Sequence, residues 1–180
     1  MLTLLPMTAS LDLEAQALEE AAWVHQAALL GIATPADIVR WADAKIMAID
    51  EPSLWLIELS TLKSRNLEEF AGLIGPELVE PLSTTAKISL IAAALEQGHI
   101  GFDKAVSNLN VTWILTAGSD REYEFGKLWD LVPELDQLDR DGPAWDDFSL
   151  RFRGALAIHL AANNFGPGRP FLISQPLPSC

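Results

Sequence analysis

The densest set of candidate metal ligands is the aspartate-rich segment "DQLDRDGPAWDDF" in the last third of the chain. An EF-hand loop binds Ca²⁺ with acidic side chains at its first, third and fifth positions, then has a glycine, and ends with a glutamate at the twelfth. Alignment on Gly142 puts Asp139 and Asp141 at the third and fifth positions, but Gln137 at the first and Phe148 at the twelfth. Because two essential ligands are missing, the sequence predicts no calcium site here.

Histidine and cysteine are too few for an obvious zinc site or an activated nucleophile. The chain has 3 His and 1 Cys, and these are His25, His99, His159 and Cys180. It contains no HExxH pair, no GxSxG elbow and no phosphate-binding glycine loop. His25 and His159 lie on apolar faces of predicted helices, which is typical of core histidines. The sequence therefore predicts no catalytic residue, no cofactor and no metal, and we expect a non-enzymatic protein.

Carboxylates are also frequent in "DIVRWADAKIMAIDEPSLWLIELS", which begins at Asp37. Apolar residues of its first half recur with helical spacing on one stripe, and the acids fall elsewhere, which favours a solvated helix face over an acidic active site. The stripe consists of Ile38, Trp41, Ala42, Ile46 and Ile49. Paired carboxylates for glycoside hydrolysis stay an open alternative, because the sequence does not give their separations.

Negative charge is concentrated between Asp120 and Asp147. Ten acidic and three basic residues there give a net charge of −7, more than half of the −13 of the whole chain. Such a field attracts a basic partner and accelerates its association. We predict that the partner-binding residues are Glu122, Glu124, Asp136, Asp139, Asp141, Asp146 and Asp147. The alternative is that these acids form only a solvated face.

Helical periodicity recurs along the chain, with capping residues, glycine and proline between the periodic segments. Helices are expected over approximately residues 10–30, 35–50, 52–62, 66–75, 83–98, 102–117, 119–132 and 143–163. The fold class is therefore all-α, a single-domain bundle of about eight helices over residues 1–165, followed by an extended Pro/Gly-rich tail over residues 166–180.

Apolar spacing also predicts which side chains face the core. In the third helix we expect Leu54, Ile57 and Leu62 to face inward. Asn66 and Glu69 are spaced as a reciprocal capping box. The last helix contains "GALAIHLAA", which is apolar on every side and predicts a central buried helix.

Charge and hydropathy exclude several classes of partner. A net charge of −13 opposes binding to nucleic acids and to anionic membranes. The chain has no apolar run of about 18 residues, and its first residues lack the basic flank of a secretory signal. We therefore expect a cytoplasmic protein whose partner is neither a nucleic acid nor a membrane. The oligomeric state is not predicted.

One segment carries a resemblance to a known group of proteins. The segment "HQAALLGIATPADIVRWADAKIMAIDEPSLWLIELS" resembles a pattern in small acidic helical bacterial proteins, some of which are similar to immunity proteins encoded beside polymorphic toxins. The matching positions are Gly31, Ile38, Trp41, Ala42, Asp43, Asp50, Pro52 and Glu58. The resemblance implies a helical fold and a toxin as the partner, and it provides no catalytic motif.

The functional expectation is a protein-binding domain, interpreted as an immunity protein that neutralises a basic toxin. Two alternatives stay open. One is a small helical enzyme or small-molecule-binding protein without a recognisable motif, and the other is a structural or adaptor subunit. The partner's identity does not follow from the sequence.

Overall fold

The computed structural model describes residues 7–116, 125–128, 130–138 and 142–162. Every regular element in these ranges is a helix, so the all-α fold class is confirmed. The described residues fall into two compact units, one within residues 7–82 and one within residues 83–162. The predicted boundary between residues 165 and 166 lies outside the described residues.

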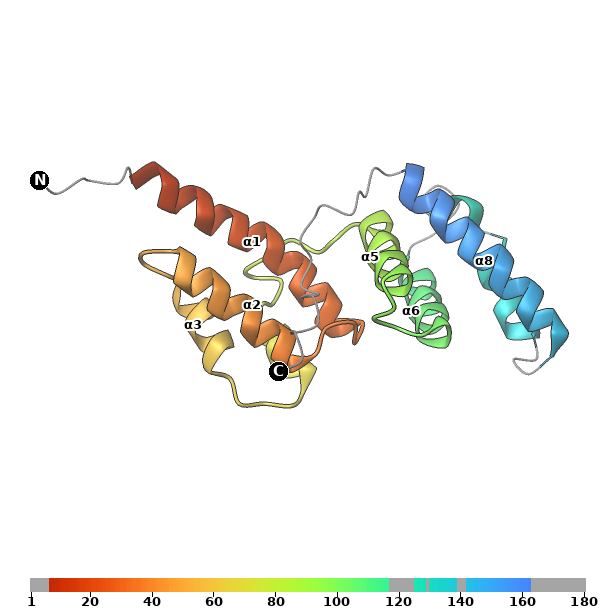
Figure 1. Ribbon diagram of the computed structural model, residues 1–180, viewed down its shortest axis with the longest axis horizontal. Coiled ribbons are helices and arrows are strands. Elements are labelled where there is room, and N and C mark those ends of the chain that lie inside the picture. The colour runs from red at the N-terminus through yellow and green to blue at the C-terminus, as the bar shows by residue number, and fades with distance from the viewer. Residues whose placement is uncertain (1–6, 117–124, 129, 139–141, 163–180) are drawn as a thin grey trace, which may run out of the picture. The chain divides into compact units, whose positions relative to one another are not determined.

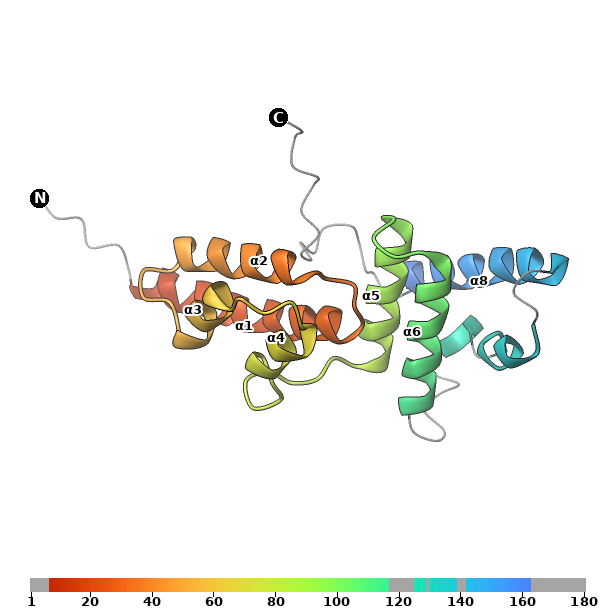
Figure 2. The ribbon, with the colours of Figure 1, turned by 90° about the horizontal axis from the view of Figure 1, so that it is seen from below.

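The first unit contains four helices. They are α1 (Met7–Leu29), α2 (Pro35–Ala48), α3 (Leu54–Thr61) and α4 (Leu67–Leu73). Helices α2 and α3 pack side by side and are joined by a short turn, while α4 packs mainly on α1 (Figures 1 and 2).

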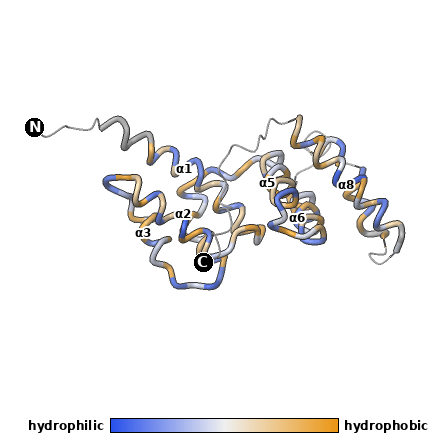
Figure 3. Tube along the Cα trace, viewed as in Figure 1, coloured by the Kyte–Doolittle hydropathy of each residue, from blue (hydrophilic) through white to orange (hydrophobic). Residues whose placement is uncertain are grey.

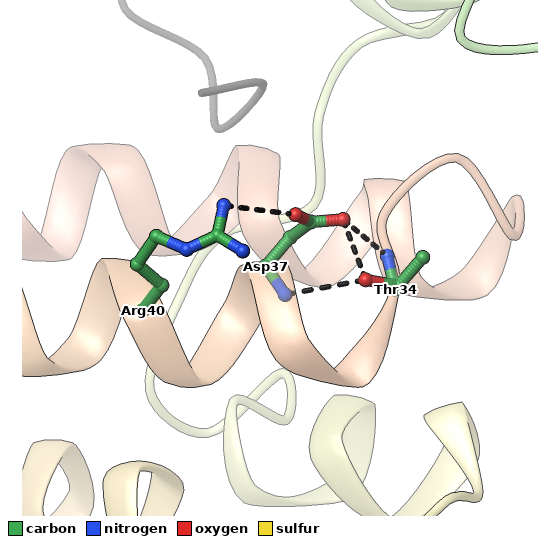
Figure 4. A network of polar contacts seen from close by, with 3 residues as sticks. All are labelled: Thr34, Asp37 and Arg40. Atoms are coloured by element: carbon green, nitrogen blue, oxygen red, sulfur yellow. Dashed lines mark hydrogen bonds and ion pairs between the residues drawn. The ribbon is translucent and has the colours of Figure 1, made fainter. Parts of the chain in front are cut away.

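Local side-chain contacts fix the start of α2 (Figure 4). Thr34 Oγ1 accepts a hydrogen bond from the Asp37 backbone N–H at 3.3 Å, and the Asp37 carboxylate accepts from the Thr34 N–H at 3.0 Å. This reciprocal pair satisfies two backbone donors that a helix start leaves unpaired. Pro35 takes a position where its missing N–H is not needed. Arg40 forms an ion pair with Asp37 at 3.4 Å.

The core of the first unit confirms the predicted stripe of α2 but corrects the predicted face of α3. Ile38, Trp41 and Ala42 are buried in α2. In α3 the buried residues are Leu56 and Leu59, whereas the side chains predicted to face inward include Leu54, which is 69% exposed, and Ile57, which is 40% exposed; Leu62 is half-buried. The first four residues of "LWLIELST" are all apolar, so the periodicity of this helix does not specify one buried face.

The predicted reciprocal capping box at the start of α4 is also wrong. The Asn66 side chain accepts from the Glu68 N–H at 3.0 Å, as an N-cap residue should. The Asn66 N–H, however, donates to Ser64 Oγ at 2.9 Å. An upstream serine therefore takes the place that the sequence predicts for Glu69.

The second unit is built on a pair of helices and a long third helix. Its elements are α5 (Thr84–Glu96), α6 (Phe102–Leu115), the 3₁₀ helices η1 (Gly126–Leu128) and η2 (Val132–Gln137), and α8 (Pro143–Ala162). Helices α5 and α6 lie side by side, α8 packs on α5 and on η1, and η2 contacts α6 (Figures 1 and 2).

Gly98 ends α5 as predicted, with a φ of +76° that favours glycine. The helix predicted over residues 119–132 begins outside the described residues. Its described second half contains the 3₁₀ helix η1 and then a turn, and η2 begins at Val132, where the predicted helix ends. Pro133 lies in the first turn of η2, where its fixed φ and missing N–H are tolerated.

An aromatic cluster forms much of the core of the second unit. Phe148 and Phe152 are fully buried on α8, and their ring centroids are 5.3 Å apart. Phe102 of α6 meets Phe152 edge-to-face at 5.6 Å and Trp145 at 5.5 Å. Edge-to-face pairs of this kind add about 0.5–1.5 kcal/mol each beyond the area that they bury.

The prediction that the second half of α8 is buried on every side is wrong. Ala155, Leu156 and His159 are buried, but Ile158 on the opposite face is 53% exposed. The outward face also includes Gly154, Ala157 and Ala161. Alanine and glycine are tolerated in water as well as in a core, so "GALAIHLAA" is compatible with an amphipathic helix.

Candidate functional site

The predicted partner-binding residues fall only partly within the described ranges. Glu122, Glu124, Asp139 and Asp141 lie outside them, and Asp136 is placed only as a backbone position of η2. Asp146 and Asp147 lie near the start of α8 and are exposed. The structure therefore places two of the seven predicted carboxylates on a solvent-facing surface, and the gathering of all seven into one patch stays a prediction.

Arg151 binds two acids of this region. Its guanidinium forms a bidentate ion pair with Glu134, with an Nη2–Oε2 distance of 2.8 Å and an Nη1–Oε1 distance of 3.2 Å. Its Nε donates to the Asp147 carboxylate at 3.0 Å. The hydrogen bond and the positive charge of Arg151 hold the pKa of Glu134 below its ordinary value. Arg151 lies four residues beyond the acidic segment. The net charge of residues 120–147 therefore does not include the cation that pairs with Glu134 and Asp147.

The α2–α3 pair presents further carboxylates that the sequence places on a solvated face. The Ser60 hydroxyl donates a hydrogen bond to the Asp43 carboxylate, which links the two helices. Asp50, Glu51 and Glu58 are exposed. Over the described parts of the chain, no cationic side chain pairs with these three acids. They therefore contribute uncompensated negative charge.

The α2–α3 pair contains two cations: Arg40 pairs with Asp37 within α2, and Lys45 is bound to a different helix. Its Nζ forms an ion pair with Glu20 of α1 at 2.7 Å, and both side chains are less than one-fifth exposed. Glu20 also accepts a hydrogen bond from Trp41 Nε1 at 2.8 Å. The Trp41 and Trp55 rings lie 6.0 Å apart between their centroids. Lys45 thus contributes to the packing of α1 against α2, and among the described residues no cation pairs with Asp50, Glu51 or Glu58.

A groove lies between α5 and α8. It has a volume of about 390 Å³ and is lined mainly by apolar side chains, among them Leu95, Leu156 and Leu160. Two charged residues, Glu96 and Arg153, also line it. The Arg153 guanidinium lies 5.0 Å from the centroid of the Phe102 ring. An apolar lining with a few charged groups is typical of small-ligand sites.

The three histidines lie on separate parts of the chain. His159 is buried on α8, and its Nε2 lies 3.3 Å from the Thr85 backbone carbonyl of α5, so an Nε2–H can donate to this oxygen. His25 is half-buried on α1, and His99 is exposed just after Gly98. Within the described ranges, no three His, Cys, Asp or Glu side chains are grouped closely enough to hold a metal ion.

A comparison of the chain with protein-family models, with curated proteins and with solved structures found no match. Among the residues that the structure describes, no helix combines the length and the hydropathy needed to cross a membrane.

Proposed function

We propose that this chain is a non-catalytic binding protein whose partner is a basic protein. The observation that supports this proposal best is the set of exposed carboxylates without a pairing cation on the α2–α3 pair, described above. Residues 1–82 contain 13 acidic and 4 basic residues, so they account for −9 of the net charge of −13. The acidic field is therefore not limited to the segment from Asp120 to Asp147.

A field of this sign gives a partner both attraction and selectivity. Opposite charges accelerate encounter, and like charges across an interface oppose incorrect partners. The resemblance of residues 25–60 to immunity proteins adds the proposal that the basic partner is a toxin. The protein would then act by covering the partner's surface.

The experiment is affinity capture with the full-length protein in its native cell, followed by identification and purification of the bound protein. Association is then measured by stopped-flow at low and high salt. The result expected is a basic partner whose association slows as salt rises. A captured partner that is neutral or acidic, or an association rate that does not depend on salt, would contradict the proposal.

The predicted acidic segment has its own test with the same partner. A variant in which Asp136, Asp139, Asp141, Asp146 and Asp147 are changed to Asn should associate more slowly and with a smaller salt dependence. Each exposed pair contributes only about 0–1 kcal/mol, so affinity should fall gradually. An unchanged rate and salt slope would show that these five acids are a solvated face.

The groove between α5 and α8 supports a second candidate, a small-molecule-binding protein. Its apolar lining and its Arg153 fit a small apolar ligand that carries a negative group. Thermal-shift measurements with a panel of short- and medium-chain carboxylic acids would detect such binding. Stabilisation that is lost in an Arg153→Gln variant would favour this function, and no stabilisation by any member would count against it.

A further inference from the structure

Three large apolar side chains are exposed on the α2–α3 pair. Met47 of α2 is 89% exposed, and Leu54 and Ile57 of α3 are 69% and 40% exposed. Leu54 and Ile57 are three residues apart, so they share one face of α3. The opposite face of α3 is the one that Leu56 and Leu59 bury in the core. Met47, Leu54 and Ile57 are therefore not part of the hydrophobic core.

The register of the two helices brings the three residues to one part of the pair. The hydrogen bond between Ser60 and Asp43 places these two residues side by side on α3 and α2. Met47 lies one turn beyond Asp43 on α2, and Ile57 lies about one turn before Ser60 on α3. Both are therefore about one turn closer to the connecting turn than the hydrogen-bonded pair. Leu54 follows one further turn along α3. Figure 3 shows hydrophobic positions on both helices and hydrophilic residues in the turn that joins them.

The residues around this apolar centre are acidic. Asp43 and Glu58 lie on the two helices, and Asp50 and Glu51 lie in the connecting turn. Of the cations of α2, Arg40 lies about one turn before Asp43 and pairs with Asp37, and Lys45 is bound to Glu20 on another helix. The next exposed cations along the chain, Lys63 and Arg65, follow the opposite end of α3. The α2–α3 face, defined as Met47, Leu54 and Ile57 with Asp43, Asp50, Glu51 and Glu58, thus has an apolar centre and a negative rim.

We propose that the α2–α3 face is the docking surface for a basic amphipathic helix of the partner. This inference rests on the proposed function and names the surface and the chemistry of the partner. A basic amphipathic helix offers one apolar stripe flanked by Lys and Arg, which complements an apolar centre with a negative rim. A second copy of this chain does not fit, because its own acids would oppose those of the rim. Met47 adds adaptability, because an unbranched thioether side chain fits apolar surfaces of different shapes.

The test uses the full chain and a 20-residue helical peptide with leucines on one face and lysines on both flanks. Binding is measured by fluorescence anisotropy, and the binding site is mapped by amide chemical shifts of the ¹⁵N-labelled protein. A second peptide, with glutamate in place of every lysine, reports the contribution of charge. We expect the basic peptide to bind, the acidic peptide to bind at least tenfold more weakly, and the largest shifts to fall within residues 43–58.

Two matched pairs of variants separate this face from the rest of the surface. The apolar variant changes Met47, Leu54 and Ile57 to Ala, and its control changes the exposed Val111, Ile114 and Leu115 of α6 to Ala. The charge variant, Asp43→Asn with Asp50→Asn, Glu51→Gln and Glu58→Gln, has as its control Glu68, Glu69, Glu77 and Glu80 changed to Gln, all exposed in the same unit. Each control removes the same number of apolar side chains or of charges.

Each variant of the face should weaken peptide binding about tenfold or more, as loss of interface anchors does, while each control should change it less than threefold. Equal losses in a variant and its control, or shifts confined to other residues, would overturn the assignment of this face but leave the proposed function standing. If neither the basic peptide nor any basic protein binds the wild-type chain, the proposed function fails together with the inference.

Discussion

The indole N–H of Trp41 donates a hydrogen bond of 2.8 Å to the carboxylate of Glu20, which lies 21 residues earlier on a neighbouring helix. The same carboxylate binds the Lys45 ammonium at 2.7 Å. One partly buried acid of α1 therefore holds two side chains of α2. Because hydrogen bonds to a charged group are stronger than neutral ones, this contact contributes to the packing of α1 against α2.

Glu20→Ala should lower the free energy of unfolding by about 2 kcal/mol, because it leaves the Trp41 N–H and the Lys45 ammonium without their acceptor in a partly buried site. Glu20→Gln keeps an acceptor for Trp41 and should cost about half as much. Urea denaturation followed by circular dichroism measures both. The control is Glu19→Ala on the exposed face of the same helix, which should change stability by less than about 0.5 kcal/mol. A loss as large in the control would show that the contacts of Glu20 with Trp41 and Lys45 are not the cause.

Arg151→Gln should raise the pKa of Glu134 towards the ordinary glutamate value, because Arg151 is the group that lowers it. A carboxyl group whose pKa is depressed in the folded state adds stability above its unfolded-state pKa, and this stability is lost as the pH falls through its folded-state pKa. The stability difference between wild type and Arg151→Gln should thus be present at neutral pH and shrink in acid. NMR titration of the Glu134 side chain measures the pKa. Arg153→Gln is the control, and an equal shift in it would contradict the role of Arg151.

Phe152→Ala should destabilise the protein by about 3–5 kcal/mol, because this ring is fully buried between Phe102 and Phe148 and its removal leaves a cavity. Leu150→Ala, two residues earlier on the same helix and 72% exposed, should change stability by less than about 0.5 kcal/mol. Thermal and urea unfolding of both variants would show the difference. Similar losses of stability in the two variants would contradict the burial of Phe152 and the exposure of Leu150 on α8.

Two glycine substitutions in the same unit should act in opposite directions. Gly98 has a φ of +76°, so Gly98→Ala should cost about 1 kcal/mol. Gly154 lies inside α8, and a methyl group there would meet nothing within 4 Å. Gly154→Ala should therefore stabilise the protein by about 0.5–1 kcal/mol through its better helix propensity. Melting temperatures that move in the same direction would contradict the conformations of these glycines.

The sequence by itself determined the features that depend on neighbours along the chain. The approximate bounds of most helices, the end of α5 near residue 98 and the apolar stripe of α2 follow from contacts within a few residues, so local residue types suffice to predict them. The all-α class follows from the same periodicity. In the predicted acidic segment, Asp146 and Asp147 are exposed, and their role in partner binding stays a prediction.

The tertiary structure alone decided the features that depend on contacts distant in sequence. Leu54 and Ile57 are exposed and Leu56 and Leu59 are buried because of where α3 packs, and a helix that is apolar at consecutive positions does not encode that choice. The sequence also does not reveal that Arg151 pairs with Glu134, 17 residues away, or that Lys45 is bound to Glu20. Which acids keep uncompensated charge, and hence where the proposed basic partner would dock, depends on which cation the packing brings to each acid.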